Sequence, residues 1–186
     1  MLPTLIDAWI DPPRLQMPPG LWASWALWAA PALAIQTAAE EMAFRGYLMQ
    51  GLAARFRSAW IWWVLPALLF GMLHWDPGTY GPNAWLVMLG VGLTGLLLGD
   101  VTARLGNLSA AMGLHFANNA AVLLLVAPPS QLGGLSLWTS AVGPGDPDAF
   151  RGLLLGDIAT TLLGYACWRL WWAWHRRLHS EGGENI

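Results

Sequence analysis

The side chains best placed for chemistry in this sequence are two acids and an arginine inside a long apolar stretch. Glu40, Glu41 and Arg45 follow a run, 21–39, that contains no ionisable side chain. A carboxylate in apolar surroundings costs free energy unless a partner neutralises it. Arg45 lies four residues after Glu41, so the two share one helix face and can form an ion pair. Glu40 points about a quarter-turn away and could face a cavity as a general base.

Two later sites supply partners for that carboxylate. His74 ends an apolar stretch and precedes a loop rich in turn residues, so its ring can reach into a polar chamber. His115 and Asn119 are four residues apart and share a helix face. A His and an Asn side by side can both donate hydrogen bonds to one developing oxyanion. No Ser or Cys stands in a comparable position, which favours direct attack of water on a peptide carbonyl over a covalent acyl-enzyme.

Each of these sites also has a structural interpretation. The paired acids and Arg45 could simply join helices, and His74 could be an interfacial histidine. The pair His115 and Asn119 could form interhelical hydrogen bonds, and Asn118, also one turn from His115, could replace Asn119. Asp157 is a second acid in an apolar run, for which we expect a cavity-lining or helix-pairing role, with direct involvement in the reaction as the alternative.

A metal site is the open chemical alternative. Two histidines and a glutamate match a catalytic zinc ligand set with one open position. However, the sequence has no His-Glu-x-x-His pattern, and an arginine beside the acids repels a nearby cation. We therefore expect no cofactor, with zinc as the alternative.

The composition indicates which elements hold these side chains. Hydrophobic residues make up 56% of the chain and charged residues 11%, less than half the roughly 25% usual in soluble domains. Apolar runs of roughly the 17–25 residues that cross a bilayer recur along the sequence. The pattern predicts an all-α fold, a polytopic transmembrane bundle of about five spans in one domain, 1–186. The net charge of −2 gives no indication of nucleic-acid binding.

The first predicted span is the least regular. It runs over 21–54, either as one helix kinked at Pro31 or as an interfacial helix followed by a spanning one, which would give six helices. The remaining spans and the segments outside them are as follows: spans 60–74, 85–103, 108–127 and 150–174, an irregular arm 1–19, a loop 128–148 and a disordered tail 178–186.

Arginine distribution predicts the orientation of the bundle. The arginines near the ends of the predicted spans fall on two sides, with Arg14 and Arg151 on one and the following on the other: Arg55, Arg57, Arg104, Arg176 and Arg177. The positive-inside rule makes the second side, and the C-terminus, cytoplasmic. At about 1.5 Å per residue the three polar sites reach different depths, so a common site requires a kinked helix or an inward-folded loop after His74.

Three motifs in this order resemble those of a known family. They are Glu40-Glu41-x-x-x-Arg45, Phe70-x-x-x-His74 and His115-x-x-x-Asn119. Together they are similar to the motifs of the CAAX-prenyl-endopeptidase and bacteriocin-processing (Abi) family of intramembrane proteases. The phrase 44–48 after the paired acids strengthens the likeness, and the matched region covers about residues 35–125.

This resemblance implies an endopeptidase whose site is sunk in the membrane. By similarity, four residues would be catalytic: Glu40 and His74 activating water, His115 and Asn119 forming the oxyanion hole. Glu41 and Arg45 would support the site. The implied substrate is a membrane-associated protein or peptide, prenylated or not, and the implied location is a bacterial cell membrane. The alternatives are a non-proteolytic scaffold or bacteriocin-immunity partner and a proton-coupled transporter, although the sequence lacks the repeated halves typical of transporters.

Overall fold

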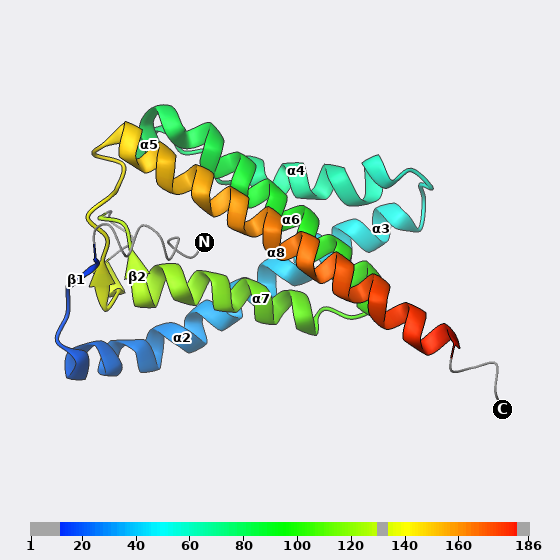
Figure 1. Cartoon of the computed structure of the whole chain (residues 1–186), viewed down its shortest axis with the longest axis horizontal. Coiled ribbons are helices and arrows are strands. Elements are labelled where there is room, and N and C mark those ends of the chain that lie inside the picture. The colour runs from blue at the N-terminus through cyan, green and yellow to red at the C-terminus, as the bar shows by residue number, and fades with distance from the viewer. Residues whose placement is uncertain (1–11, 130–133, 182–186) are drawn as a thin grey trace.

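The computed structural model describes residues 12–129 and 134–181, and most of these are helical (Figure 1). This confirms the predominantly helical fold expected from the composition. The helix that carries Glu40 and Glu41 begins as α2, Pro19–Glu41. It continues through a π-helical segment, Met42–Met49, into α3, Gln50–Ala53. Pro31 is accommodated inside α2, and the departure from α-helical geometry starts directly after Glu41. Such π-helical turns are frequent at functional sites.

The next two long helices pack very closely against each other. A π-helical segment, Trp60–Val64, leads into α4, Leu65–Met72, which lies along α6, Ala84–Leu105. At Gly71 an added Cβ would stand only 2.6 Å from the backbone oxygen of Met88, so only glycine allows this approach. The close contact fixes the end of α4 against α6.

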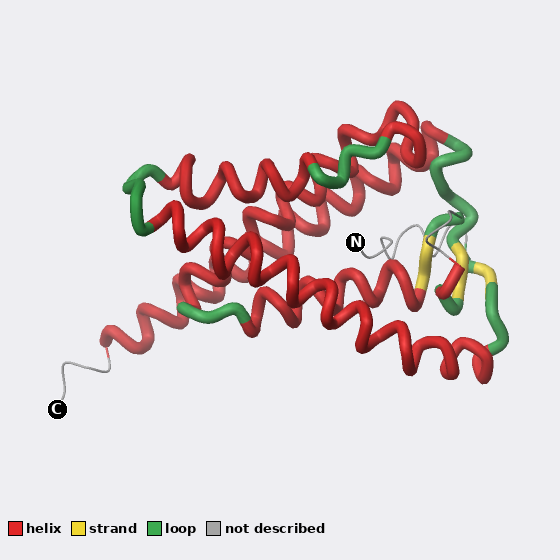
Figure 2. Tube along the Cα trace, turned by 180° about the vertical axis from the view of Figure 1, so that it is seen from behind, coloured by secondary structure: helices red, strands yellow, loops and turns green. Residues whose placement is uncertain are grey.

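Two further helices complete the bundle. Helix α7, Ser109–Ala120, continues as a π-helical segment, Ala121–Leu125, and runs beside α2. Helix α8, Pro147–Glu181, lies against α6 and crosses the other helices, as both views show (Figures 1 and 2). Helix α8 extends through Glu181, into the segment predicted as a tail from residue 178, because the stretch 165–181 has no glycine or proline to stop it. Residues 182–186 lie outside the described ranges.

A small sheet was not expected from the sequence. Its strands are β1, Arg14–Leu15, β2, Val126–Ala127, and β3, Trp138–Thr139, in the order β1-β3-β2. β3 is antiparallel to β1 and parallel to β2. The sheet thus joins the segment predicted as an irregular arm, 1–19, to the predicted loop 128–148. It also ends the helical part of the predicted fourth span, 108–127, two residues before the predicted end. Two-residue strands are too short to show the alternation that reveals a strand.

The predicted loop after α4 is partly helical. It contains α5, Pro77–Tyr80, and a 3₁₀ turn, Gly81–Asn83. The Asp76 side chain accepts a hydrogen bond from the Thr79 N–H at 3.1 Å and so caps α5. Hydrogen bonds from Thr79, the side chain first and then the backbone, hold the pKa of Asp76 below its usual value. The segment between His74 and α6 is therefore ordered as two short helical turns.

Length and apolar composition identify a single candidate membrane span in the described part of the chain. It is the stretch Pro77–Leu105, and 44% of its most apolar window is buried within the protein. Two shorter apolar helices are Trp60–Met72 and Ser109–Leu125. Large apolar side chains such as Trp28 and Ile35 of α2 are mostly exposed. The five spans inferred from the sequence therefore stay a prediction.

Candidate active site

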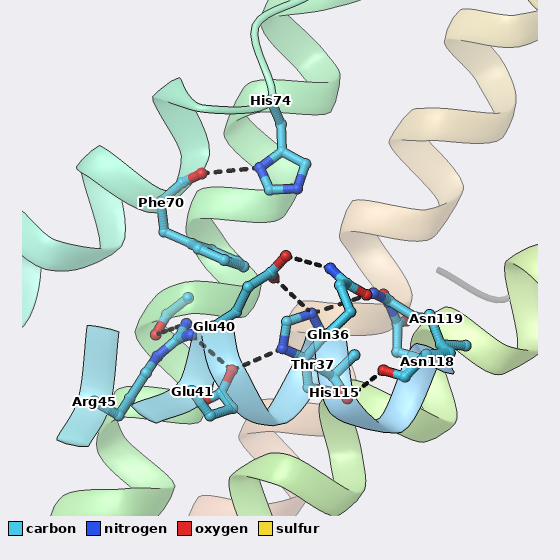
Figure 3. Close-up of polar contacts among 12 residues, drawn as sticks. Gln36, Thr37, Glu40, Glu41, Arg45, Phe70, His74, His115, Asn118 and Asn119 are labelled. Atoms are coloured by element: carbon cyan, nitrogen blue, oxygen red, sulfur yellow. Dashed lines mark hydrogen bonds and ion pairs between the residues drawn. The ribbon is translucent and has the colours of Figure 1, made fainter. Parts of the chain in front are cut away.

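Glu41 is the buried anchor of the polar cluster. The residue is fully buried, and its Oε1 accepts hydrogen bonds from Arg45 Nη1 and from His115 Nδ1, each at 2.7 Å (Figure 3). The ion pair predicted from the spacing of Glu41 and Arg45 is therefore confirmed. The bond to His115 places the hydrogen of the imidazole on Nδ1, because a carboxylate only accepts. Glu41 thus sets both the orientation and the tautomer of His115.

Arg45 connects three elements at this point. Its guanidinium lies 4.6 Å from the centre of the Phe70 ring of α4, and its Nη2 donates to the Gly95 carbonyl of α6 at 3.2 Å. Only 3% of Arg45 is exposed. A planar guanidinium can make an ion pair, a carbonyl hydrogen bond and a ring contact together, which an ammonium group cannot do equally well. The charge of Glu41 is therefore balanced by a group held in place from two other helices.

Glu40 is less enclosed than Glu41. Its Oε1 accepts a hydrogen bond from Gln36 Nε2, and its Oε2 lies 3.6 Å from His115 Nε2. Oε2 is buried and, like Glu41 Oε2, has no hydrogen-bond partner among the described residues. The prediction that Glu40 is separate from the Glu41–Arg45 pair agrees with this geometry. Sequence reasoning missed Gln36, although its position four residues before Glu40 places the two on one helix face.

His115 stands between the two glutamates and Asn119. The imidazole is nearly buried, and Asn119 Nδ2 donates to His115 Nε2 at 3.3 Å. Asn118 Nδ2 in turn donates to Asn119 Oδ1 at 3.4 Å. The structure thus brings together the helix-face pair predicted from the four-residue spacing, with Asn119 rather than Asn118 against the ring. In this arrangement Nε2 is an acceptor, since Nδ1 already carries the hydrogen.

His74 faces the same region from the turn after α4. Its Nδ1 donates to the Phe70 carbonyl at 2.9 Å, so Nε2 keeps its lone pair. The Phe70 ring is 5.1 Å from the His74 ring and 5.7 Å from the His115 ring, centre to centre, in edge-on contacts. Phe70 is 2% exposed and therefore acts as the spacer that separates the two histidines. Its role as a spacer was missed, although its position four residues before His74 indicates a shared face.

One cavity of about 360 Å³ lies beside this cluster, and its described lining residues include His74 and His115 but not Glu40. Its polar lining comes from α2, the turn after α4, α6 and α7: Gln36, His74, Thr94, His115, Asn118 and Asn119. Tyr80 of α5 also lines it, so the segment after His74 does fold inward. An inward-folded loop after His74 is one of the two arrangements that the depths estimated from the sequence required for a common site. We call this cavity the polar chamber.

The polar chamber is lined by histidine and amide side chains, of which histidine is a common metal ligand. Within residues 12–129 and 134–181, no group of three or more His, Cys, Asp or Glu side chains is arranged to hold a metal ion. The metal dependence considered from the sequence stays a prediction for experiment.

Comparison with known proteins identifies the motif-bearing region. The model of a family described as type II CAAX prenyl endopeptidase Rce1-like matches residues 22–121, which include every candidate catalytic and supporting residue. A curated relative, the uncharacterized protein YyaK of Bacillus subtilis (strain 168), is 31% identical over 167 residues. That alignment covers 84% of this chain and 51% of YyaK, so the chain spans about half the length of this relative. No solved structure matches the chain.

Proposed function

Because the chain belongs to the Rce1-like family of type II CAAX prenyl endopeptidases, we propose that it is an intramembrane endopeptidase that hydrolyses peptide bonds in the polar chamber. The observation that carries the proposal is that His74 and His115 line one cavity, while Glu40 Oε2 lies 3.6 Å from His115 Nε2. Buried ionisable groups are expensive in a membrane and are normally retained for function.

Glu40 is the proposed general base. A water molecule in the polar chamber gives a proton to Glu40 Oε2 while its oxygen attacks the carbonyl carbon of the scissile bond. The absence of a hydrogen-bond partner for this oxygen among the described residues supports the role. His74 Nε2 has a lone pair and can accept the second hydrogen bond of the same water. When the carbon–nitrogen bond breaks, Glu40 returns the proton to the leaving amine.

His115 and Asn119 are the proposed oxyanion donors. His115 Nε2 and Asn119 Nδ2 are 3.3 Å apart, close enough to reach one oxygen atom. To donate from Nε2, His115 must be the imidazolium, with Nδ1–H donating to Glu41 and a second proton, taken from solvent before the reaction, on Nε2. Losing one oxyanion donor typically lowers kcat by about 10²–10³-fold. Glu41 and Arg45 support the site by holding the His115 ring.

The proposed setting is a multi-pass membrane bundle of five spans with a cytoplasmic C-terminus. The family consists of membrane proteins. The loop after α3, the end of α6 and the end of α8 lie toward one end of the molecule, opposite the sheet and α5 (Figure 1). Those three segments carry the arginines that the positive-inside rule places in the cytoplasm. The proposed substrate is a membrane-associated protein or peptide, cleaved without a metal ion.

The proposal is tested by comparing peptides released from cells that express the wild type or Glu40→Gln. Removing a general base should lower release of specific peptides by at least about 100-fold. Asp148→Asn is the matched control, because it removes one carboxylate that is exposed at the start of α8. Equal release by wild type and Glu40→Gln would overturn the proposal and favour a non-proteolytic scaffold. A chelator added to membranes containing the wild type should change nothing, and loss of release would indicate zinc.

A further inference from the structure

Gln36 of α2 contacts Glu40 and also lines the polar chamber. Its Nε2 donates a hydrogen bond to Glu40 Oε1, whereas Glu40 itself is not among the described residues that line the polar chamber (Figure 3). Gln36 also lines a neighbouring cavity of about 370 Å³, whose other described lining residues are all apolar. The two cavities share Gln36 and Leu123. The carboxamide therefore lies at the boundary between an apolar and a polar space, directly beside the proposed base.

The surroundings of Gln36 on α2 are apolar. The residues one turn before it are Ala32 and Leu33, and the adjacent Ile35 is 72% exposed. A carboxamide in apolar surroundings costs free energy unless it is hydrogen-bonded, and Glu40 is its hydrogen-bond partner among the described residues. A pair of this spacing that only joined two side chains on a helix surface would affect stability slightly and catalysis not at all. The position of the pair at the polar chamber indicates a role in the reaction instead.

We propose that Gln36 is a positioning residue that fixes the Glu40 carboxylate, so that Oε1 is held and Oε2 is the oxygen that receives the proton. The inference rests on the proposed endopeptidase function. Without a hydrogen bond the carboxylate rotates easily about its last side-chain bond, and its two oxygens are equivalent. With Oε1 bound to Gln36, Oε2 lies 3.6 Å from His115 Nε2 and has no hydrogen-bond partner among the described residues.

A neutral donor suits this task. Glu41 is held by the cation of Arg45, which balances its charge. The carboxamide of Gln36 holds Glu40 through one N–H and adds no positive charge, so the carboxylate keeps its ability to accept a proton from water. The two neighbouring acids are therefore held in different ways that match their proposed roles, Glu41 as a support and Glu40 as the base.

Gln36→Met tests the inference, because methionine has a similar length and shape but no N–H. The full chain in lipid nanodiscs is given a fluorogenic peptide that spans a site cleaved by the wild type and not by Glu40→Gln. A displacement of about 1 Å can lower a rate about 100-fold, so we expect kcat to fall about 10- to 100-fold with KM within about twofold. Gln50→Met is the matched control and should leave both constants within about twofold. Gln50 lies in α3 of the same continuous helix, is exposed and is not among the described residues that line either cavity.

Carbon-13 NMR of the glutamate carboxyl groups detects the hydrogen bond without any catalysis. The sequence has four glutamates, and the Glu40 signal is the one that disappears in Glu40→Gln. Gln36→Met should shift the Glu40 signal and leave the Glu41 signal near its wild-type position. Gln50→Met should shift neither signal.

The outcomes separate the inference from the proposed function. Equal cleavage by wild type and Glu40→Gln would overturn the proposed peptidase, and the positioning role would fall with it. Cleavage that depends on Glu40, combined with an unchanged kcat in Gln36→Met or an unmoved Glu40 signal, would overturn the inference alone. A rise in KM at unchanged kcat would also overturn it, because Gln36 would then bind the substrate. A lowered thermal midpoint in Gln36→Met, with all four glutamate signals displaced, would indicate a structural role and contradict the inference.

Discussion

At the scale of single residues, His115 is the point where the polar contacts meet. Its Nδ1 is bound by Glu41, its Nε2 lies near Glu40 and Asn119, and its ring contacts Phe70. A histidine held on one nitrogen by a carboxylate presents the other nitrogen in a fixed direction. Glu41 therefore holds the His115 ring in place, and Glu40 lies next to that ring.

The dependence of this arrangement on Arg45 can be measured by Arg45→Met. The substitution leaves Glu41 as a buried carboxylate without its cation, which typically costs about 3–5 kcal/mol. We expect a fall of this size in the free energy of unfolding, together with loss of activity as His115 loses its support. Reversible denaturation in mixed micelles measures the first effect. Arg57→Met, at an exposed arginine, is the control and should stay within about 0.5 kcal/mol of the wild type.

A partial rescue would identify the cause of that loss. In Arg45→Met combined with Glu41→Gln, the buried charge is removed while the acceptor for His115 Nδ1 is kept. We expect the double variant to be more stable than Arg45→Met alone. If the two are equally unstable, the lost contacts of Arg45 with Gly95 and Phe70 account for the effect, and the charge argument is wrong.

At the scale of elements, the spacing of α4 and α6 positions His74. Phe70, Gly71 and His74 occupy the last turns of α4 and the turn after it, where Gly71 is pressed against the backbone of α6. The carbonyl of Phe70 then holds the His74 ring. Any displacement of α4 from α6 should consequently move a proposed catalytic residue as well as weaken packing.

Gly71→Ala tests this coupling. The new Cβ would meet Met88 O at 2.6 Å, and backbone cannot yield as a side chain does. Overpacking of this kind costs about 1–3 kcal/mol, and we expect a drop in cleavage rate beyond the loss in stability. Gly113→Ala in α7 is the matched control, because nothing lies within 4 Å of its added Cβ. That change should be neutral or stabilising by up to about 1 kcal/mol. Equal behaviour of the two variants would show that the α4–α6 contact is not tight.

At the scale of the whole molecule, the sequence predicts contacts along one helix better than contacts between helices. The pairs Glu41–Arg45 and His115–Asn119 follow from a four-residue spacing alone. The bond between Glu41 and His115 requires α2 to lie beside α7, which no local pattern indicates. The sheet was missed for a similar reason, since its strands are short and β1 pairs with β3 more than a hundred residues further along the chain. The π-helical segments carry no compositional mark.

The orientation of the whole chain is predicted from the distribution of its arginines, and the fold indicates which positions can test it. In a Cys167→Ala background, single cysteines at two exposed positions, Ser58→Cys and Asp148→Cys, report on opposite ends of the bundle. With five spans and a cytoplasmic C-terminus, a membrane-impermeant maleimide should label Asp148→Cys on intact cells and Ser58→Cys only after lysis. The opposite pattern would reverse the orientation. Labelling of both positions on intact cells would show that the predicted second, third and fourth spans do not separate them, because three crossings must leave residues 58 and 148 on opposite sides.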